Sequence, residues 1–378
     1  TVSPLPPPRL EPPERSRSQR RTRPIMYRFL WRIREEWKLL GFFEINHDHE
    51  SYQLSCMLKE GLKTSIQHAI DHPVTTVSLG FAQPSLYFSL QGFEMRTYAG
   101  PIFARFRQFL GLVDLEYQKA LSCEAFYLQF ISNSKSNADF FLTSNDKRFF
   151  LKTQRKREIR FLLANLQKYL KHMERYPHSI LVKFLGKVPA LLRKKTLSFF
   201  GSRRYDIKGC EVDRWADPAP DGSEVIVVFK DLNFGQNVIC LEQQRDWLVQ
   251  QVEVDTDFLK ELHVIDYSFL VGLQPLHEDE QLLNKALANI ITRTTISVGL
   301  GLCQNRRLLP GSRNPLHVID GPDYRYFVGI IDFFTVYGCR KKLEHLWKSI
   351  RYRGRSFSTV HPACYARRLC KWVEDHTT

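Results

Sequence analysis

Residues 138–153 read ADFFLTSNDKRFFLKT, and residues 154–177 continue as QRKREIRFLLANLQKYLKHMERYP. The first stretch holds two apolar runs separated by turn-forming Ser, Asn and Asp residues, which predicts a β-hairpin. In the second stretch apolar residues recur every three or four positions from Ile159 to Met173, the period of a helix that buries one face. Pro177 should follow the end of that helix. A hairpin followed by a long amphipathic helix therefore organises this part of the chain.

Two charged residues flank the connection between the hairpin and the helix. Lys152 lies at the end of the second strand, and Glu158 lies one turn before Leu162, on the side of the apolar stripe. Such a Lys and Glu can pair across a sheet, and in kinases a pair of this kind directs the lysine to the phosphates of ATP. Because many strand–helix units contain a Lys and a Glu, the pair alone does not identify a kinase.

The remainder of the chain mixes strand and helix patterns. We predict a strand over 225–230, an amphipathic helix over about 243–263, a strand over 325–332 and a final helix from Pro362. Together with the hairpin, this mixture predicts an α+β protein. The length of 378 residues is sufficient for two lobes with separate cores.

Two acidic residues, Asp266 and Asp332, each interrupt or end a run of apolar residues. An ionised carboxylate is costly in apolar surroundings unless it has a partner. One explanation is that each acid caps neighbouring backbone groups. The other is that the two acids converge on Mg²⁺ and a hydroxyl group. The residues alone favour neither explanation.

Five short motifs occur in a fixed order along the chain. They are FFLKTQRKRE (149–158), YDIKGC (205–210), FKDLNF (229–234), IDYSFL (265–270) and GIID (329–332). In this order they resemble motifs of the phosphatidylinositol phosphate kinase family, in its phosphatidylinositol-4-phosphate 5-kinase-like branch. The resemblance implies a two-lobed α+β fold distantly related to protein kinases. The N-terminal lobe would cover 25–204 and the C-terminal lobe 205–378.

The resemblance also implies roles for individual residues. Lys152 would hold ATP phosphates, with Glu158 as its orienting partner, and Asp332 would be the ligand of Mg²⁺. Asp266 would face the attacking inositol hydroxyl, and Lys208 would approach phosphate. Phosphoryl transfer depends on positioning and charge neutralisation, so two cations and two acids around a metal ion suit this chemistry.

A basic segment near the C-terminus has the character of a membrane contact. Residues 340–368 resemble the specificity loop of the type I kinases and its flanks, and the basic residues that we expect to face lipid are Lys341, Lys342, Arg351, Arg353 and Arg355. Near an anionic leaflet each such charge contributes about 1 kcal/mol. We therefore expect phosphatidylinositol 4-phosphate and an anionic membrane as partners.

Charge and cysteine content indicate which partners and which cellular compartment to expect. The chain carries 55 Lys and Arg against 40 Asp and Glu, a net charge of +15, which suits a polyanionic partner. The known nucleic-acid-binding signatures do not accompany this charge, so we expect no nucleic acid partner. Eight scattered cysteines without a regular spacing favour a reducing compartment. We therefore expect a cytoplasmic protein, peripheral at membranes, with a disordered Pro- and Arg-rich arm over residues 1–24.

Two departures from the family pattern affect the nucleotide site. Residues 133–138, NSKSNA, contain no glycine where the family has a glycine-containing turn over the phosphates. The segment 187–204 is short and lacks clean strand alternation, which predicts an incomplete wall beside adenine. Two hypotheses follow. The chain is a phosphatidylinositol-4-phosphate 5-kinase of low intrinsic activity, or it is a scaffold that binds membrane and joins active type I kinases as a hetero-oligomer.

Overall fold

The computed structural model describes residues 42–72, 84–90, 93–130, 140–142, 149–187, 190–194, 203–220, 227–276 and 317–378. The predicted disordered arm over residues 1–24 and the glycine-free turn at 133–138 lie outside the described residues. Within the described residues, helices and strands are mixed and the protein is α+β.

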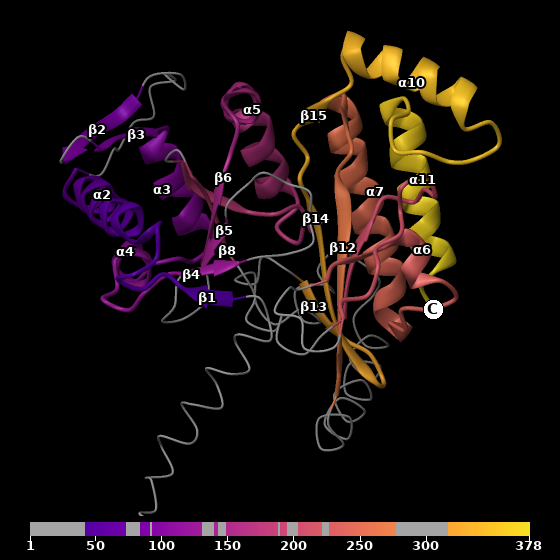
Figure 1. Cartoon of the computed structure of the whole chain (residues 1–378), viewed down its shortest axis with the longest axis horizontal. Helices are drawn as coiled ribbons and strands as arrows, with labels where there is room; N and C mark the ends of the chain where they lie inside the picture. The colour runs from indigo at the N-terminus through magenta and orange to yellow at the C-terminus, as the bar shows by residue number, and fades with distance from the viewer. Residues whose placement is uncertain are drawn as a thin grey trace, which may run out of the picture.

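The N-terminal half contains a six-stranded antiparallel sheet (Figure 1). In spatial order its strands are β1 (Phe42–Glu44), β4 (Leu128–Phe130), β5 (Phe140–Leu142), β6 (Phe149–Thr153), β8 (Ala190–Lys194) and β7 (Phe184–Lys187). Helices and a separate hairpin accompany this sheet: α2 (Tyr52–Asp71), β2 (Pro84–Leu90), β3 (Phe93–Tyr98), α3 (Gly100–Phe109) and α4 (Asp114–Leu121).

The predicted hairpin and helix are confirmed. Strands β5 and β6 pair antiparallel, with Phe141 opposite Leu151, and α5 (Lys156–Arg175) follows β6 directly. The apolar stripe of α5 is buried at Leu162 and Leu166, as its period indicates. This arrangement places Lys152 near the end of β6, immediately before the helix.

Part of the segment 187–204 forms a strand, and the predicted incomplete wall beside adenine stays a prediction. Residues 190–194 form strand β8, which pairs with β6 on one side and β7 on the other. The pairing joins backbone N–H and C=O groups, and it is present here although the sequence of this strand lacks clean alternation. The sheet is therefore continuous from β6 to β7, beside Lys152.

The C-terminal half is built on a five-stranded sheet. In spatial order its strands are β10 (Phe229–Lys230), β9 (Arg203–Ile207), β12 (Ser268–Pro275), β14 (Tyr324–Ile331) and β13 (His317–Asp320). Only the β10–β9 pair is parallel. The remaining elements here are α6 (Asp231–Phe234), η1 (Glu242–Gln244), α7 (Arg245–Glu261), β11 (Val264–Ile265), β15 (Thr335–Val336), α10 (Cys339–Arg351) and α11 (Pro362–Asp375).

Two of these helices confirm predictions. The helix expected over about 243–263 is η1 followed by α7, and the final helix begins at Pro362 as α11. Helices α7 and α11 pack on one another beside the sheet (Figure 1). Leu248, Val252 and Leu369 are among the side chains that they bury completely. The predicted division of the chain at residue 204 stays a prediction.

A buried carboxylate ties the two halves together. Asp255 of α7 is fully buried and accepts hydrogen bonds from the Ser179 hydroxyl (2.7 Å) and the Ile180 amide (2.8 Å). His172 Nε2 of α5 lies 2.6 Å from the same carboxylate. The residues that follow Ser179 then pair with Ile330 of β14. These contacts fix helix α5 and residues 179–182 relative to the end of β14. Asp332 is the residue that follows this strand.

Candidate active site

Three of the predicted site residues come together at one edge of the five-stranded sheet. Lys208 follows the last residue of β9, Asp266 lies two residues before β12, and Asp332 follows the last residue of β14. Strands β9 and β14 both run antiparallel to β12. Because the end of one strand lies beside the start of its antiparallel neighbour, the three residues share an edge. The topology therefore gathers three sequence motifs that are far apart in the chain.

Both acids adopt an unusual backbone conformation. Asp266 has φ +63° and Asp332 has φ +61°, in the left-handed region. Most residues with a Cβ avoid this region, but Asp tolerates it because its short polar side chain can bond locally. The chain thus turns sharply at Asp266, before β12, and at Asp332, after β14. Backbone strain of this kind is often found at functional sites.

Lys152 from the other sheet reaches this edge. Its Nζ lies 2.7 Å from Asp332 Oδ1, and the lysine side chain is 8% exposed against 43% for the aspartate. A buried ammonium requires a nearby acceptor or counter-charge. The Lys152–Asp332 pair therefore links β6 to the end of β14 and leaves part of the carboxylate accessible.

The structure gives Glu158 a contact within its own helix. Its carboxylate accepts a hydrogen bond from the Arg155 amide at 3.2 Å, at the N-terminus of α5. The sequence predicted Glu158 as a partner of Lys152. In the structure, Asp332 lies beside Lys152. A role for Glu158 in orienting Lys152 stays a prediction.

Asp266 lies among cations. Lys208 donates to the backbone carbonyl of Asp266, and Lys341 Nζ of α10 lies 3.0 Å from Asp266 Oδ2. Burial alone would raise the pKa of Asp266. The charges of Lys208 and Lys341, with hydrogen bonds from Ser358 and Lys341, outweigh burial and lower that pKa below its ordinary value. Asp266 is therefore ionised at neutral pH.

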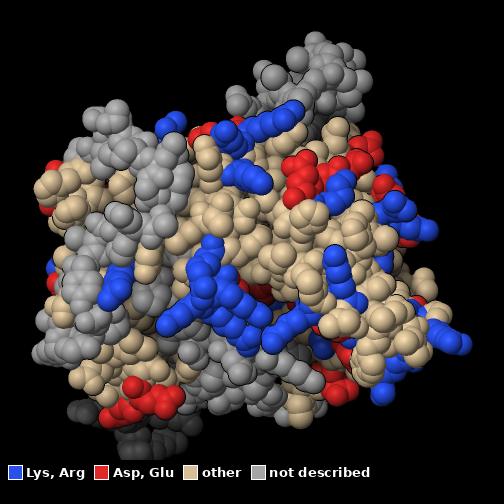
Figure 2. Space-filling view, turned by 90° about the horizontal axis from the view of Figure 1, so that it is seen from above, with Lys and Arg blue, Asp and Glu red and all other residues tan. Residues whose placement is uncertain are grey.

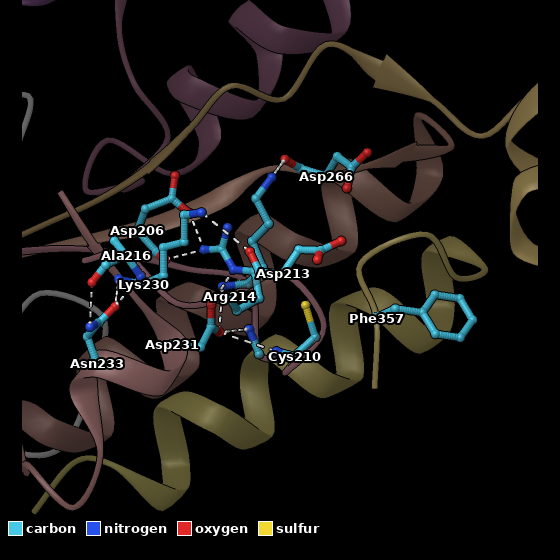
Figure 3. A network of polar contacts seen from close by, with 12 residues as sticks. Asp206, Cys210, Asp213, Arg214, Ala216, Lys230, Asp231, Asn233, Asp266 and Phe357 are labelled. Carbon is cyan, nitrogen blue, oxygen red and sulfur yellow. Dashed lines mark hydrogen bonds and ion pairs between the residues drawn. The ribbon is translucent and has the colours of Figure 1, made fainter. Parts of the chain in front are cut away.

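A network around Asp231 fixes the backbone of the Lys208 segment (Figure 3). One carboxylate oxygen of Asp231 accepts from the amides of Lys208 (2.9 Å), Gly209 (2.6 Å) and Cys210 (3.2 Å). The other oxygen accepts from Nε of Arg214 at 2.6 Å. Three convergent amides on one carboxylate define the loop conformation closely. Asp231 is therefore a positioning residue for Lys208.

Arg214 completes this network from the centre of the view in Figure 3. It bridges Asp231 and Asp206, and it is 7% exposed. Burial would lower the pKa of the guanidinium, but the two carboxylates raise it above its ordinary value. Asp231 and Arg214 were not identified from the sequence. The motif FKDLNF contained Asp231, but only its proximity to the Lys208 loop shows what the carboxylate does.

Asn233 makes a pair of hydrogen bonds with Ala216. Its Oδ1 accepts from the Ala216 amide at 2.9 Å, and its Nδ2 donates to the Ala216 carbonyl at 2.9 Å (Figure 3). An ionised carboxylate has no hydrogen to donate to that carbonyl. The amide therefore suits the local structure of this chain.

Helix α11 encloses the same loop from the other side. Gly209 has φ +66°, and a Cβ there would lie 3.2 Å from the backbone oxygen of Arg368. Arg368 Nη1 donates to the Phe357 carbonyl at 2.8 Å, and Nη2 lies 3.3 Å from the Lys208 carbonyl. Glycine at position 209 is required both for the conformation and for this close approach.

The carboxylates suit a metal ion that arrives with phosphate. Among the described residues, no group of three or more His, Cys, Asp or Glu side chains could enclose a metal ion. Mg²⁺ is commonly bound by one or two carboxylates together with substrate phosphates. The partly exposed carboxylate of Asp332, beside Lys152, fits such a shared site. The residues present thus fit Mg²⁺ in the form of a nucleotide complex.

Helix α10 presents an apolar stripe to solvent near this site. Leu343, Leu346, Trp347 and Ile350 are 69%, 60%, 54% and 64% exposed, and no residue of the helix is buried. Their spacing of three and four places all four on one face. An unpartnered apolar face of this kind marks a contact surface.

Basic residues flank this stripe. Lys342, Arg351, Arg353 and Arg355 are exposed, whereas Lys341 turns to Asp266. Helices α5 and α10 both reach the top of the molecule in Figure 1, and Figure 2 shows Lys and Arg gathered on that face. At the start of α5, Arg155, Lys156 and Arg157 are exposed as well. Within the described part of the chain, no helix is long and apolar enough to cross a bilayer.

Comparison with known proteins identifies the family. The family model described as Phosphatidylinositol-4-phosphate 5-Kinase matches residues 121–376. The chain belongs to this family. It is 49% identical over 367 residues to human phosphatidylinositol 4-phosphate 5-kinase-like protein 1 and 45% identical over 365 residues to the mouse protein, with 92% of each chain covered in both cases.

More distant members of this kinase family also match. A zebrafish (Danio rerio) phosphatidylinositol 5-phosphate 4-kinase type-2 gamma is 26% identical over 326 residues, covering 75% of this chain and 77% of its own. Arabidopsis thaliana phosphatidylinositol 4-phosphate 5-kinase 5 is 24% identical over 398 residues, covering 87% of this chain and 50% of its own. The resemblance inferred from the five motifs is therefore confirmed.

Proposed function

We propose that this chain is an ATP-dependent lipid kinase of low intrinsic activity, which phosphorylates phosphatidylinositol 4-phosphate to phosphatidylinositol 4,5-bisphosphate at a membrane surface. The observation that carries the proposal is the convergence of Lys208, Asp266 and Asp332 on one sheet edge, with Lys152 paired to Asp332. Family membership supplies the substrate class.

Each residue has one task in the proposed reaction. Lys152 neutralises charge on the ATP phosphates, and it exchanges its contact with Asp332 for phosphate oxygens. Asp266 accepts a hydrogen bond from the attacking inositol hydroxyl and so orients it. Lys208, held by the amide contacts of Asp231, approaches the transferred phosphoryl group. Fixed charges in a partly enclosed site lower the barrier because they need no rearrangement during transfer.

Asp332 is the residue that would hold Mg²⁺. When bound with ATP, the metal ion neutralises charge on the phosphates. The backbone of Asp332 is set by β14, which is in turn held by the residues anchored on Asp255. The carboxylate is thus held at the end of a rigid strand. We also propose that this site is related to the active site of protein kinases.

Membrane contact in this proposal uses helix α10 and the residues that follow it. The apolar stripe enters the interface, and Lys342, Arg351, Arg353 and Arg355 face anionic head groups. An amphipathic helix lies in the plane of a membrane when one face is apolar and the other basic. Because α10 begins shortly after Asp332, a docked helix brings the catalytic edge to the lipid surface.

A second candidate is a scaffold that binds membrane and localises active type I kinases. It is favoured by residues 133–138, where Ser, Lys and Asn replace the glycines that let backbone amides approach phosphate. A defect there would impair nucleotide binding and leave α10 intact. The continuous β6–β8–β7 sheet supports the first candidate over this one.

Nucleotide binding distinguishes the two candidates. A thermal-shift titration with Mg-ATP should stabilise the wild-type protein by about 2.7 kcal/mol at one hundred times the Kd. Lys152→Ala should abolish the shift, whereas Lys171→Ala, which removes an exposed lysine on α5, should preserve it. In the same preparations, Asp332→Asn should abolish phosphate transfer to phosphatidylinositol 4-phosphate vesicles while leaving vesicle binding intact.

The opposite results are equally informative. If millimolar Mg-ATP produces no shift, the kinase proposal is wrong and the scaffold candidate replaces it. In that case, co-purification with a type I phosphatidylinositol phosphate kinase becomes the decisive measurement. For either candidate, Arg351, Arg353 and Arg355 changed together to Glu should release the protein from anionic vesicles at low salt. Unchanged binding would exclude the membrane role of this segment.

A further inference from the structure

A fully buried carboxylate joins helix α5 and the residues after it to α7. Asp255 of α7 accepts hydrogen bonds from the Ser179 hydroxyl at 2.7 Å and from the Ile180 amide at 2.8 Å, on different oxygens. His172 Nε2 of α5 lies 2.6 Å from the oxygen that accepts from Ser179. Ser179 and Ile180 are as fully buried as Asp255. Because a buried charge is costly without its hydrogen-bond donors, these partners are held closely around it.

One set of contacts leads from this carboxylate to Asp332. The Ile180 carbonyl accepts a hydrogen bond from the Ile330 amide at 2.8 Å, and the Val182 amide donates to the Ile330 carbonyl at 3.0 Å. Ile330 lies near the end of β14, and Asp332 follows that strand. Asp255 therefore fixes the backbone beside Asp332 through Ile180.

A second set of contacts leads from the same carboxylate to Lys152. Besides its contact with the acid, the ring of His172 stacks on Phe258 of α7, with centroids 4.2 Å apart and an angle of 20° between the planes. These contacts attach α5 to α7. Helix α5 follows β6, the strand of Lys152, after a very short connection. The position of the helix therefore limits the position of Lys152.

The ion pair between Lys152 and Asp332 is a temporary link between the same elements. Their charged atoms lie 2.7 Å apart, but in the proposed function the lysine leaves the aspartate for the phosphates of ATP. The hydrogen bonds of Asp255 involve none of these atoms, so they remain when the pair separates. A link that remains can keep two groups at a fixed separation, and such positioning is a large part of catalysis.

We propose that Asp255 is a positioning residue that holds Lys152 and Asp332 in alignment for Mg-ATP. It acts through His172 on the side of α5 and through Ile180 on the side of β14. This inference rests on the proposed function for the roles of Lys152 and Asp332. An amide at position 255 has one acceptor oxygen in place of two, so Asp255→Asn weakens both sets of contacts at once.

Thr256 provides a matched control on the same helix. It is the next residue of α7 and is also fully buried. Its hydroxyl donates to the Glu253 carbonyl within the helix at 3.1 Å and lies 3.2 Å from the Cys370 sulfur of α11. Asp255→Asn and Thr256→Val thus both disturb buried hydrogen bonds of α7, but the contacts of Thr256 lie in α7 and α11. A role in stability alone predicts the same behaviour for the two variants.

The first experiment compares Mg-ATP binding by calorimetry at a temperature at which both variants are folded. Asp255→Asn should raise the Kd about tenfold, the effect of losing much of one charge-assisted contact. Thr256→Val should leave the Kd unchanged, even if its melting temperature falls as far. Equal Kd values for the two variants would overturn the proposal.

Substitutions at position 172 test the route through α5. The side-chain amide of His172→Gln can donate a hydrogen bond to Asp255 where the ring nitrogen lies, so its Kd for Mg-ATP should be close to that of the wild-type protein. His172→Leu cannot donate, and it should resemble Asp255→Asn. If the two substitutions weaken binding equally, the contact with Asp255 does not position Lys152.

The second experiment uses the protein without nucleotide. In hydrogen exchange measured by mass spectrometry, the amides of Ile180, Val182 and Ile330 should exchange faster in Asp255→Asn than in Thr256→Val, because their segments lose a common anchor. Amides of α11 should show the reverse order. Equal exchange in the two variants would contradict the proposed link.

Two further outcomes have defined meanings. If Asp255→Asn does not fold, Ser179→Ala takes its place, since it removes one hydroxyl and leaves the Ile180 contact. It should change binding and exchange in the same direction by a smaller factor, and wild-type values for both would overturn the proposal. A wild-type protein that does not bind Mg-ATP would refute the proposed function, and the exchange comparison would still test the link through Asp255.

Discussion

Two regions at the same edge of the C-terminal sheet are built in opposite ways. The loop from Lys208 to Cys210 is held by buried groups, with three of its amides on the Asp231 carboxylate. Helix α10, which also touches this edge, buries none of its residues and is held by partly exposed ion pairs. Conformation is closely specified in the first region and weakly specified in the second.

Under the proposed function, this difference matches what each region would do. A residue that approaches a transferring phosphoryl group has to be fixed before the reaction, because small errors in position are costly for catalysis. A helix that meets a membrane has to expose its apolar face and exchange one set of contacts for another. Substitutions should therefore affect stability strongly in the Lys208 loop and weakly in α10.

The largest effect is expected for Asp231→Ala. The substitution removes the acceptor of three amides and leaves Arg214 with one of its two carboxylates, so the free energy of unfolding should fall by about 3–5 kcal/mol. Chemical denaturation measures this change. Asp206→Ala, which removes the more exposed partner of Arg214, should cost much less. Equal losses would mean that the amide contacts contribute little.

Gly209→Ala should produce the next largest loss. The left-handed conformation at position 209 costs an alanine about 1–2 kcal/mol, and the new Cβ would lie 3.2 Å from the Arg368 backbone oxygen. Gly354→Ala provides the comparison, since Gly354 also has a positive φ but has open space around it. Thermal denaturation should show a larger loss for Gly209→Ala, and the excess measures the close contact with α11.

Glu344→Gln should have a small and pH-dependent effect. Burial would raise the pKa of Glu344, but hydrogen bonds from Lys348, Thr359 and Lys341 outweigh it and lower the pKa to about 2. A carboxylate with a lowered pKa stabilises the folded state above its ordinary pKa and loses this effect as the pH falls towards 2. Because the side chain is one-third exposed, the contribution should not exceed about 1 kcal/mol.

The measurement is the free energy of unfolding of the wild-type protein and Glu344→Gln between pH 2 and pH 7. The difference between the two proteins should be constant above about pH 5 and disappear near pH 2. Lys348→Met should reduce this difference, because it removes the first of the three hydrogen-bond partners. A difference that grows on acidification would contradict the assignment.

The smallest effect on stability is expected for Leu346→Ala. This side chain is 60% exposed on α10, so the free energy of unfolding should change by no more than about 0.5 kcal/mol. Leu369→Ala on α11, where the side chain is fully buried, should cost about 2–5 kcal/mol. Vesicle binding should show the reverse order. A Leu346→Ala variant that is strongly destabilised would mean that α10 packs on the protein in solution.

Local sequence patterns predicted several elements closely. The hairpin β5–β6, helix α5 and the start of α11 at Pro362 were all recognisable from turn residues, apolar period and proline placement. Residues 190–194 form strand β8, which the sequence did not reveal because it lacks clean alternation, and the incomplete wall beside adenine stays a prediction. The sequence motifs also predicted the family, which the comparisons confirm.

The sequence by itself determined which residue types were available: two acids at strand ends, lysines in two motifs, and a basic segment near the C-terminus. The tertiary structure alone decided their partners. Lys152 meets Asp332 across 180 residues of chain, and Lys341 meets Asp266 across 75. No local pattern encodes such pairs, because contacts between distant residues depend on strand order and register. The contacts of Asp231 and Lys341 follow from that order, and for this reason they appear only in the folded protein.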